Sequence, residues 1–192
     1  MGAMNGYNTG LRSREALERL KLGNAAYVNG QHFGDLSDAR RLDTAEHGQN
    51  PYAVVVCCSD SRSIPEVAFS CGIGDIFVIR VAGNVIDNHQ LGSIEYAASH
   101  LGIRLIVVLG HTHCGAVGAA IHHAPEGYVK TITDEVLKAI GDEKDEYKAA
   151  CLNVKRIETS LEIQREESEH GLAVLPAILD IETGKVRFLR EL

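Results

Sequence analysis

Three side chains that suit a metal ion follow two apolar segments of this 192-residue chain. Cys58 comes directly after the apolar residues 54–57, and His111 and Cys114 come shortly after the apolar residues 105–109. Two thiolates and an imidazole suit Zn²⁺, and three protein ligands leave a tetrahedral ion one open position, as in catalytic sites. The alternative is that both cysteines are small core residues and the histidine a hydrogen-bonded turn residue. We expect one zinc ion per chain, held by these three residues.

Asp60 and Arg62 lie two and four residues after the first candidate ligand. A guanidinium beside a carboxylate keeps the carboxylate ionised and fixes its orientation through a bidentate contact. The alternative is an ordinary structural ion pair at the end of a strand. Cys57 precedes Cys58 and points to the opposite face of a regular strand, so we expect it in the core.

The elements that must position these side chains alternate between strands and helices. Both apolar runs are rich in β-branched residues, too short to cross a membrane and stopped by polar residues, which is typical of buried parallel strands. We expect strands from Pro51 to the first thiols and at residues 75–81, 104–109, 172–179 and 186–189. We expect helices at residues 13–28, 37–47, 65–70, 90–100, 116–121, 131–140 and 146–169.

This order predicts an α/β fold, with a mostly parallel central sheet flanked by helices, a C-terminal edge strand or hairpin and an N-terminal helical arm. We expect one domain over residues 1–192, in which residues 1–12 are flexible and residues 13–47 form the arm. Ligands of such sheets bind at the carboxyl ends of the strands, where both apolar runs end.

Several details of these elements follow from the pattern. Leu17, Leu20 and Tyr27 share one face of the first helix, while Ser37 is a candidate N-cap and Gly48 a stop for the second.

Pro176 lacks a ladder donor, so the strand at residues 172–179 is expected at an edge or at a bulge. The long helix at residues 146–169 is expected to place Val154, Ile157, Leu161 and Gln164 on one face, and residues 142–146 to form a solvated connection.

Composition and charge exclude several classes of protein. The net charge is -7 and no basic cluster is present, which argues against a nucleic-acid partner. Residues 1–10 lack the basic and apolar regions of a secretory signal, and we expect no membrane association. Five cysteines, an odd number, do not suggest a disulfide framework, so we expect a reducing, cytoplasmic location.

The chain resembles the β-class carbonic anhydrases at the residues that carry this chemistry. That family has Cys-x-Asp-Ser-Arg after its first strand and Gly-His-x-x-Cys-Gly after a later one, matched here at residues 58–62 and 110–115. The likeness extends through residues 20–24, 44–51, 74–84, 93–96 and 180–186. The resemblance implies that Asp60 accepts a hydrogen bond from the attacking water, and that Arg62 keeps Asp60 from blocking the metal.

Further residues near the expected pocket have less certain roles. Ser61, Gly83, Asn84 and Gly115 are expected to shape a narrow pocket, where glycines allow close backbone approach. Cys71 stands where this family often has a glutamine that faces the substrate, and it is expected at the pocket mouth.

Histidines outside the expected ligand set allow several interpretations. His113 could replace His111 as a ligand or shuttle protons. His122 and His123 are expected in a solvated loop, with a second metal site as the alternative.

Three functions remain open from the sequence. The first is zinc-dependent interconversion of carbon dioxide and bicarbonate. The second is hydrolysis of carbonyl sulfide or carbon disulfide on the same fold, and the third is a non-catalytic zinc or bicarbonate-sensing module.

The resemblance also bears on assembly and regulation. It implies a homodimer or homotetramer, in which the first helix lies across the neighbouring subunit, although packing on its own core is the alternative. Bicarbonate-regulated members of the family use a tryptophan in a second site, and this chain has none, so we expect no such regulation.

Overall fold

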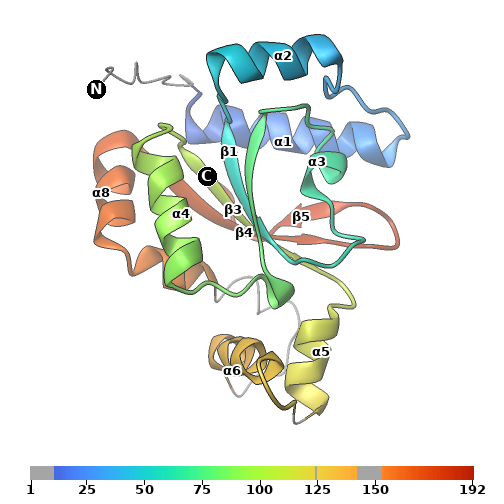
Figure 1. Ribbon diagram of the computed structural model, residues 1–192, viewed down its shortest axis with the longest axis vertical. Coiled ribbons are helices and arrows are strands. Elements are labelled where there is room, and N and C mark those ends of the chain that lie inside the picture. The colour runs from blue at the N-terminus through green and yellow to red at the C-terminus, as the bar shows by residue number, and fades with distance from the viewer. Residues whose placement is uncertain (1–10, 124, 142–152) are drawn as a thin grey trace.

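The computed structural model describes residues 11–123, 125–141 and 153–192. A five-stranded sheet in the order β2-β1-β3-β4-β5 forms its centre (Figure 1). The strands are β1 Ala53–Cys57, β2 Ile76–Arg80, β3 Leu105–His111, β4 Ala173–Leu179 and β5 Val186–Phe188. The first four strands pair in parallel, and only β5 is antiparallel to its neighbour. The expected α/β fold, with its C-terminal hairpin strand at one edge, is confirmed.

The register of the two central strands brings the candidate ligands together. Every residue of β1 and of β3 is buried, as their β-branched sequences predict. Cys57 pairs with Leu109, so the two strands end at the same edge of the sheet. Strand β3 runs two residues further than the sequence suggested and includes His111 as its last residue.

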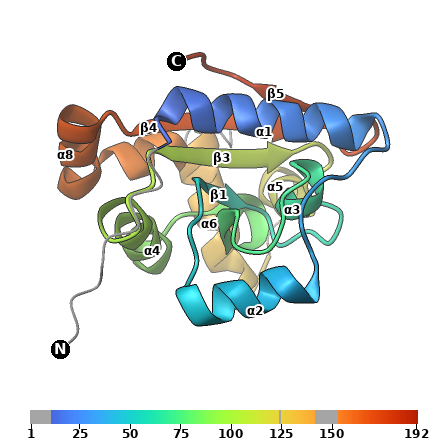
Figure 2. The same cartoon turned by 90° about the horizontal axis from the view of Figure 1, so that it is seen from above.

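Helices cover both faces of the sheet and its carboxyl edge. The helices are α1 Ser13–Val28, α2 Asp38–His47, α3 Pro65–Ala68, α4 Asn88–Ser99, α5 Gly115–His122, α6 Val129–Ile140 and α8 Leu161–His170, and residues 153–158 are also helical. Figure 2 shows α1 on one side of the sheet and α4 on the other. Helices α5 and α6 lie together beyond the strand ends (Figure 1). None of the described helices combines the length and the apolar character needed to cross a bilayer.

Alternation along β1 divides the core into two layers. Val55 and Cys57 pack in the layer under α1, with Leu17 and Leu20. Val54 and Val56 pack in the opposite layer, with residues of α4 and α8. Cys57 is therefore a core residue, as predicted.

Helix α1 packs on the core of its own chain, and its expected contact with a neighbouring subunit stays a prediction. Leu17 and Leu20 are buried, whereas Tyr27 is 37% exposed and does not complete the expected buried face. Gly23 lies so close to α3 that an added Cβ would come within 1.8 Å of the Phe69 carbonyl oxygen. Ser37 caps α2 by accepting the Arg40 N–H, and α2 ends at Gly48, both as predicted.

The expectation that Pro176 marks an edge strand or a bulge is wrong about the edge. Strand β4 lies between β3 and β5, and Pro176 pairs with Val108 in the parallel ladder. The Pro176 carbonyl oxygen accepts the Leu189 N–H just beyond β5. Because N–H and C=O of one strand residue face the same neighbour, the missing donor faces the end of the short β5 pairing, where its loss costs little.

The single helix expected at residues 146–169 is also wrong, within its described part. The helical residues 153–158 end at a turn, and α8 begins after Ser160, whose side chain accepts the Ile163 N–H as an N-cap. The Ser160 hydroxyl also donates to Glu95 of α4, at 2.6 Å. Val154 and Ile157 are buried as expected, but Leu161 is 81% exposed, because the break rotates the face of α8. The expected connection at residues 142–146 and most of the flexible residues 1–12 lie outside the described residues.

Candidate metal centre

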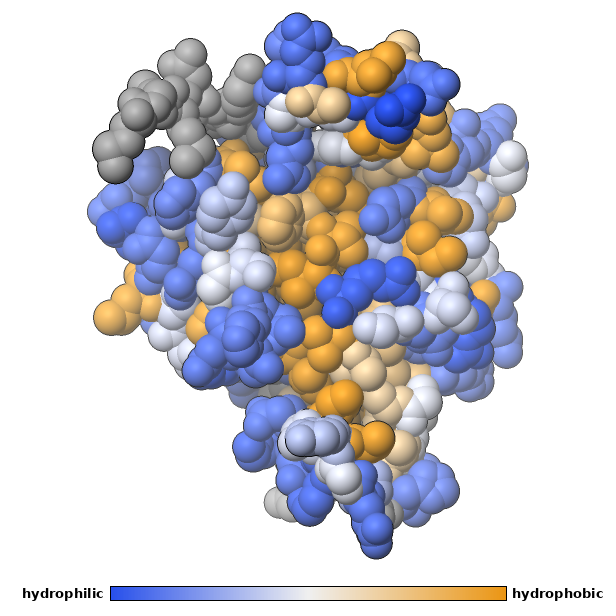
Figure 3. All heavy atoms as spheres, viewed as in Figure 1, coloured by the Kyte–Doolittle hydropathy of each residue, from blue (hydrophilic) through white to orange (hydrophobic). Residues whose placement is uncertain are grey.

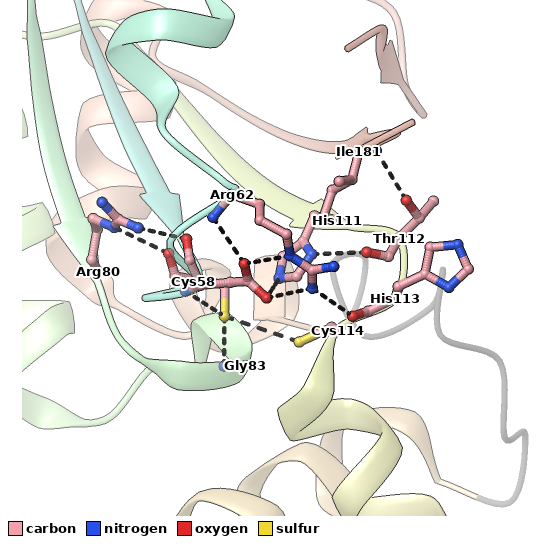
Figure 4. Close-up of polar contacts among 10 residues, drawn as sticks. Cys58, Arg62, Arg80, Gly83, His111, Thr112, His113, Cys114 and Ile181 are labelled. Atoms are coloured by element: carbon pink, nitrogen blue, oxygen red, sulfur yellow. Dashed lines mark hydrogen bonds and ion pairs between the residues drawn. The ribbon is translucent and has the colours of Figure 1, made fainter. Parts of the chain in front are cut away.

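Cys58, His111 and Cys114 meet at the carboxyl edge of the sheet, as the sequence predicted. Their ligand atoms all lie within 4.8 Å of one another, and the two sulfur atoms are 4.0 Å apart (Figure 4). All three residues are buried. Cys58 follows β1, His111 ends β3, and Cys114 is the N-cap of α5. Two neighbouring strands and one helix therefore supply the three ligand atoms.

The ring of His111 is oriented as a metal ligand needs. Its Nδ1 lies 2.9 Å from the Thr112 carbonyl oxygen, so a proton on Nδ1 is donated there and the lone pair of Nε2 is left free. Nε2 is buried and has no hydrogen-bond partner. Thr112 is itself fixed, because its hydroxyl accepts the Ile181 N–H and its own N–H donates to Leu179. An orphaned nitrogen beside two thiols fits a metal with soft ligands.

The Cys58 sulfur is held as a hydrogen-bond acceptor. It accepts the backbone N–H of Asp60 at 3.4 Å and that of Gly83 at 3.3 Å. The pKa of Cys58 is lowered, first by the hydrogen bond from the Cys114 thiol and further by His111 and these two N–H groups. The same contact, together with burial, raises the pKa of Cys114. The site therefore favours a thiolate at Cys58 before any metal is considered.

Asp60 and Arg62 form the bidentate pair that the sequence suggested. Arg62 Nε donates to Asp60 Oδ1 at 3.0 Å and Nη2 donates to Oδ2 at 2.7 Å, while Nη2 also reaches the His113 carbonyl oxygen at 3.2 Å. The hydrogen bond from Arg62 is the first reason why the pKa of Asp60 lies well below its usual range. Asp60 Oδ2 lies 3.9 Å from His111 Nε2. An ionised carboxylate is thus aimed at the three candidate ligands.

The residues expected to shape a pocket are placed in different ways. Gly83 has φ +66°, a conformation that glycine adopts readily, and in this conformation its N–H donates to the Cys58 sulfur. Asn84 is buried with φ 43°, and its side-chain nitrogen has no hydrogen-bond partner. Gly115 begins α5 directly after Cys114, and Ser61 is exposed in the turn between Asp60 and Arg62.

The structure does not bring Cys71 to this site, which corrects the expectation that it lines the pocket mouth. Its sulfur lies 3.2 Å from the Tyr52 hydroxyl, in the core layer under α1. Tyr52 precedes β1, so Cys71 lies at the opposite end of that strand from Cys58. The chain turns back after α3, where the Cys71 N–H donates to the Glu66 carbonyl oxygen, and this turn carries the thiol into the core.

The remaining histidines lie outside the cluster. His113 has a side chain that is 66% exposed and lies 3.6 Å from Glu182, so His111 and not His113 joins the two cysteines. His122 and His123 take part in no metal-ligand group within the described part of the chain.

Sequence reasoning missed two groups that hold the site from behind. Arg80 ends β2 and donates to the carbonyl oxygens of Cys58, at 3.1 Å, and of Asp60, at 2.8 Å (Figure 4). Thr112 anchors the His111 loop to the turn between β4 and β5. Both residues bind backbone atoms, so no pair of complementary side chains in the sequence indicated their roles. Arg80 lies opposite Cys57 in the pairing of β1 with β2, which only the folded sheet reveals.

Relatives with known names share the central part of the chain. The family model described as carbonic anhydrase matches residues 53–186. A carbonic anhydrase of Mycolicibacterium smegmatis is 45% identical over 130 residues, which are 65% of this chain and 63% of the relative. Carbonic anhydrase 2 of Mycobacterium tuberculosis is 46% identical over 132 residues, again 65% of this chain and 63% of the relative. The matches thus span less than two thirds of these relatives' own length.

Solved structures share the fold over most of the chain. A β-carbonic anhydrase of Aspergillus fumigatus superposes with a TM-score of 0.71 at 27% identity, covering 79% of this chain and 81% of that one. Tetrameric β-carbonic anhydrases of Sordaria macrospora give a TM-score of 0.68 at 28% identity, with 79% and 87% coverage. The family match covers both strand ends that carry the cluster, and the solved folds agree with the sheet described above, so the chain belongs to the β-carbonic anhydrase family.

Proposed function

We propose that this protein catalyses the zinc-dependent, reversible hydration of carbon dioxide to bicarbonate and a proton. The observation that carries the proposal is the buried cluster of Cys58, His111 and Cys114, with an orphaned Nε2 and the Asp60 carboxylate beside it. The first three residues would hold one zinc ion per chain. Bound there, zinc would supply a Lewis acid that lowers the pKa of a water molecule, so that hydroxide is available near neutral pH.

The residues around the cluster would orient the reactants. Asp60 carries a negative charge next to the cluster and can accept a hydrogen bond from the attacking water, which aims the water's remaining lone pair at carbon dioxide. Arg62 occupies both carboxylate oxygens of Asp60 and thereby holds Asp60 back from the metal position. The position left open by three protein ligands is therefore available to water.

The structure does not favour the two alternative functions. One feature that would favour a carbonyl sulfide or carbon disulfide hydrolase was Cys71 at the pocket mouth, and Cys71 lies in the core at the far end of β1. A non-catalytic zinc module would need a fourth protein ligand, for which Asp60 is the candidate. Asp60 is bound to Arg62 instead.

We propose further that two copies of the chain associate through the open edge of β2. This strand lies at the edge of the sheet, and its first four residues, at 76–79, are apolar and only partly buried. Tyr96 of α4, which is 43% exposed, lies beside Phe77 with ring centroids 6.4 Å apart. Figure 3 shows an apolar band running down this face. An open apolar edge strand invites pairing with another strand, and an identical edge on a second copy suits it.

Light scattering after gel filtration tests this assembly. We expect a dimer or a larger multiple for the unmodified protein, and a smaller particle for Tyr96→Lys, which puts a charge beside the edge. A monomeric unmodified protein would refute the assembly.

Single-domain organisation over residues 1–192, absence of bicarbonate regulation and a cytoplasmic location stay predictions of the sequence.

Stopped-flow carbon dioxide hydration on protein of measured zinc content tests the main proposal. We expect one zinc per chain and rapid hydration at about pH 8.5, where hydroxide is abundant. Cys58→Ser should lose zinc and activity together, whereas Cys71→Ser, a change in the core of the same chain, should keep both. Zinc-loaded protein without hydration activity would refute the substrate, and carbonyl sulfide would then be tested in the same apparatus.

A further inference from the structure

We propose that Arg80 is a positioning residue that sets the geometry of Cys58 and Asp60, an inference that rests on the proposed metal site. Its guanidinium reaches the carbonyl oxygens of both residues, at 3.1 Å from Nε and 2.8 Å from Nη2. These two carbonyl groups flank Ser59, so a single planar side chain fixes the backbone on either side of the turn. Figure 4 shows Arg80 on the side of this turn away from Cys114.

Arg80 continues the pairing of β1 with β2 beyond the end of the strands. The last regular contact is the hydrogen bond from the Val81 N–H to the Cys57 carbonyl oxygen, at 3.2 Å. After it, the backbone of β2 turns away into the short 3₁₀ helix at Ala82–Asn84. The side chain of Arg80 then supplies the two donors that the strand itself no longer offers.

The turn that Arg80 holds carries both reactive groups. The Asp60 N–H points to the Cys58 sulfur, and the Asp60 carbonyl oxygen also accepts the Ser63 N–H at 3.0 Å. Without Arg80 these weaker contacts would have to hold the turn in place. Rotation of the 58–60 backbone would move the thiolate relative to His111 and the carboxylate relative to the open metal position.

The guanidinium of Arg80 binds two backbone carbonyl oxygens of one turn. Within the described residues, Arg80 forms no ion pair with a carboxylate, although it is an exposed residue. Arg62, by contrast, donates hydrogen bonds to the carboxylate of Asp60. A lysine in place of Arg80 would keep the charge but lacks the rigid fork that bridges two carbonyl groups. The arginine is therefore matched to the geometry of the turn and not to a charge.

Cobalt(II) substitution tests this role through the spectrum of the metal site. Unmodified protein, Arg80→Lys and Arg80→Gln are loaded with cobalt(II), and the thiolate-to-cobalt and visible ligand-field bands are recorded. Zinc-loaded samples give kcat/KM against pH. Arg40→Lys is the matched control, because Arg40 Nε also donates to a backbone carbonyl, that of Ile73 at 3.0 Å, away from the site.

We expect both Arg80 variants to fold and to show altered ligand-field bands, with kcat/KM lowered about tenfold, as for loss of one charge-assisted hydrogen bond. The decrease in kcat/KM should be smaller in Arg80→Lys than in Arg80→Gln, because a lysine can still bind one carbonyl oxygen. Arg40→Lys should have the bands and the kcat/KM of the unmodified protein. Unchanged bands and an unchanged pH profile in Arg80→Lys would overturn the inference even if Arg80→Gln failed to fold. Absence of the thiolate band in the unmodified protein would instead refute the metal site itself.

Discussion

Gly83 offers the sharpest test of how the structure holds the Cys58 thiolate. Its φ of +66° is one that residues with a side chain rarely adopt, and an added Cβ would lie 3.1 Å from Val136 Cγ2 and 3.2 Å from Ala116 Cβ. The left-handed conformation costs a non-glycine residue about 1–2 kcal/mol. Moving the neighbouring side chains to relieve these two contacts costs about 1 kcal/mol more, at the low end for overpacking. Gly83→Ala should therefore lower the free energy of unfolding by about 2–3 kcal/mol.

Gly171 provides the matched control for this change. It has φ +69° after α8, and an added Cβ would meet nothing within 4 Å. Gly171→Ala should thus cost only the conformational part, about 1–2 kcal/mol. Urea unfolding of both zinc-loaded variants gives the difference, which isolates the contacts with α5 and α6.

The activity of the same variants tests the link to catalysis. The Gly83 N–H donates to Cys58, so a shift of this loop should lower kcat/KM in Gly83→Ala and leave Gly171→Ala unaffected. Equal destabilisation of the two variants would refute the packing argument. Full activity in a destabilised Gly83→Ala would refute the role of the N–H group.

Four further outcomes are expected. Asp60→Asn should keep its zinc but lose about a hundredfold in kcat/KM, since the lost charge orients the attacking water; full activity would contradict this role. The hydration rate should rise toward alkaline pH, because two thiolates offset the charge of the metal, and a flat profile from about pH 6 to 9 would contradict it. Removal of zinc by a chelator should lower the Tm, since the ligand set exists only in the folded chain; an unchanged Tm would count against the site. Burial raises the pKa of Cys57 to about 12 and that of Cys71 to about 11. Thiols of the unfolded chain ionise near pH 8.5, so the free energy of unfolding should fall between about pH 9 and 11, and less so in Cys71→Ala, as urea midpoints at several pH values would show.

The sequence predicted the ligand cluster because its geometry follows from simple rules. Buried parallel strands end at one edge, so the residues after residues 54–57 and 105–109 had to meet if the two strands were neighbours. The pairing of Asp60 with Arg62 could be predicted as well, because two residues of one tight turn can pair whatever the rest of the fold is.

What the sequence could not predict depends on contacts between distant segments. Cys71 was expected near the substrate, but the turn after α3 sends it to Tyr52 at the other end of β1. Ser160 looked like one more residue of a helix, yet its side chain accepts the Ile163 N–H as the cap of α8 and donates to Glu95 on α4. Pro176 suggested an edge because the pattern does not reveal where β5 stops. Each error reflects a partner that only the folded chain supplies.

Two of the candidate ligands lie at the ends of central strands and the third at the start of α5, and this placement bears on when a metal could be loaded during synthesis. Cys58 and Cys114 are 56 residues apart, and the chain between them builds β2 at the edge of the sheet and α4 on its face before it returns as β3. A nascent chain that has emerged only as far as β2 contains Cys58 but neither His111 nor Cys114. A metal held by all three residues would therefore bind only after β3 and the start of α5 have been made, so loading would be a late event in the biogenesis of the protein.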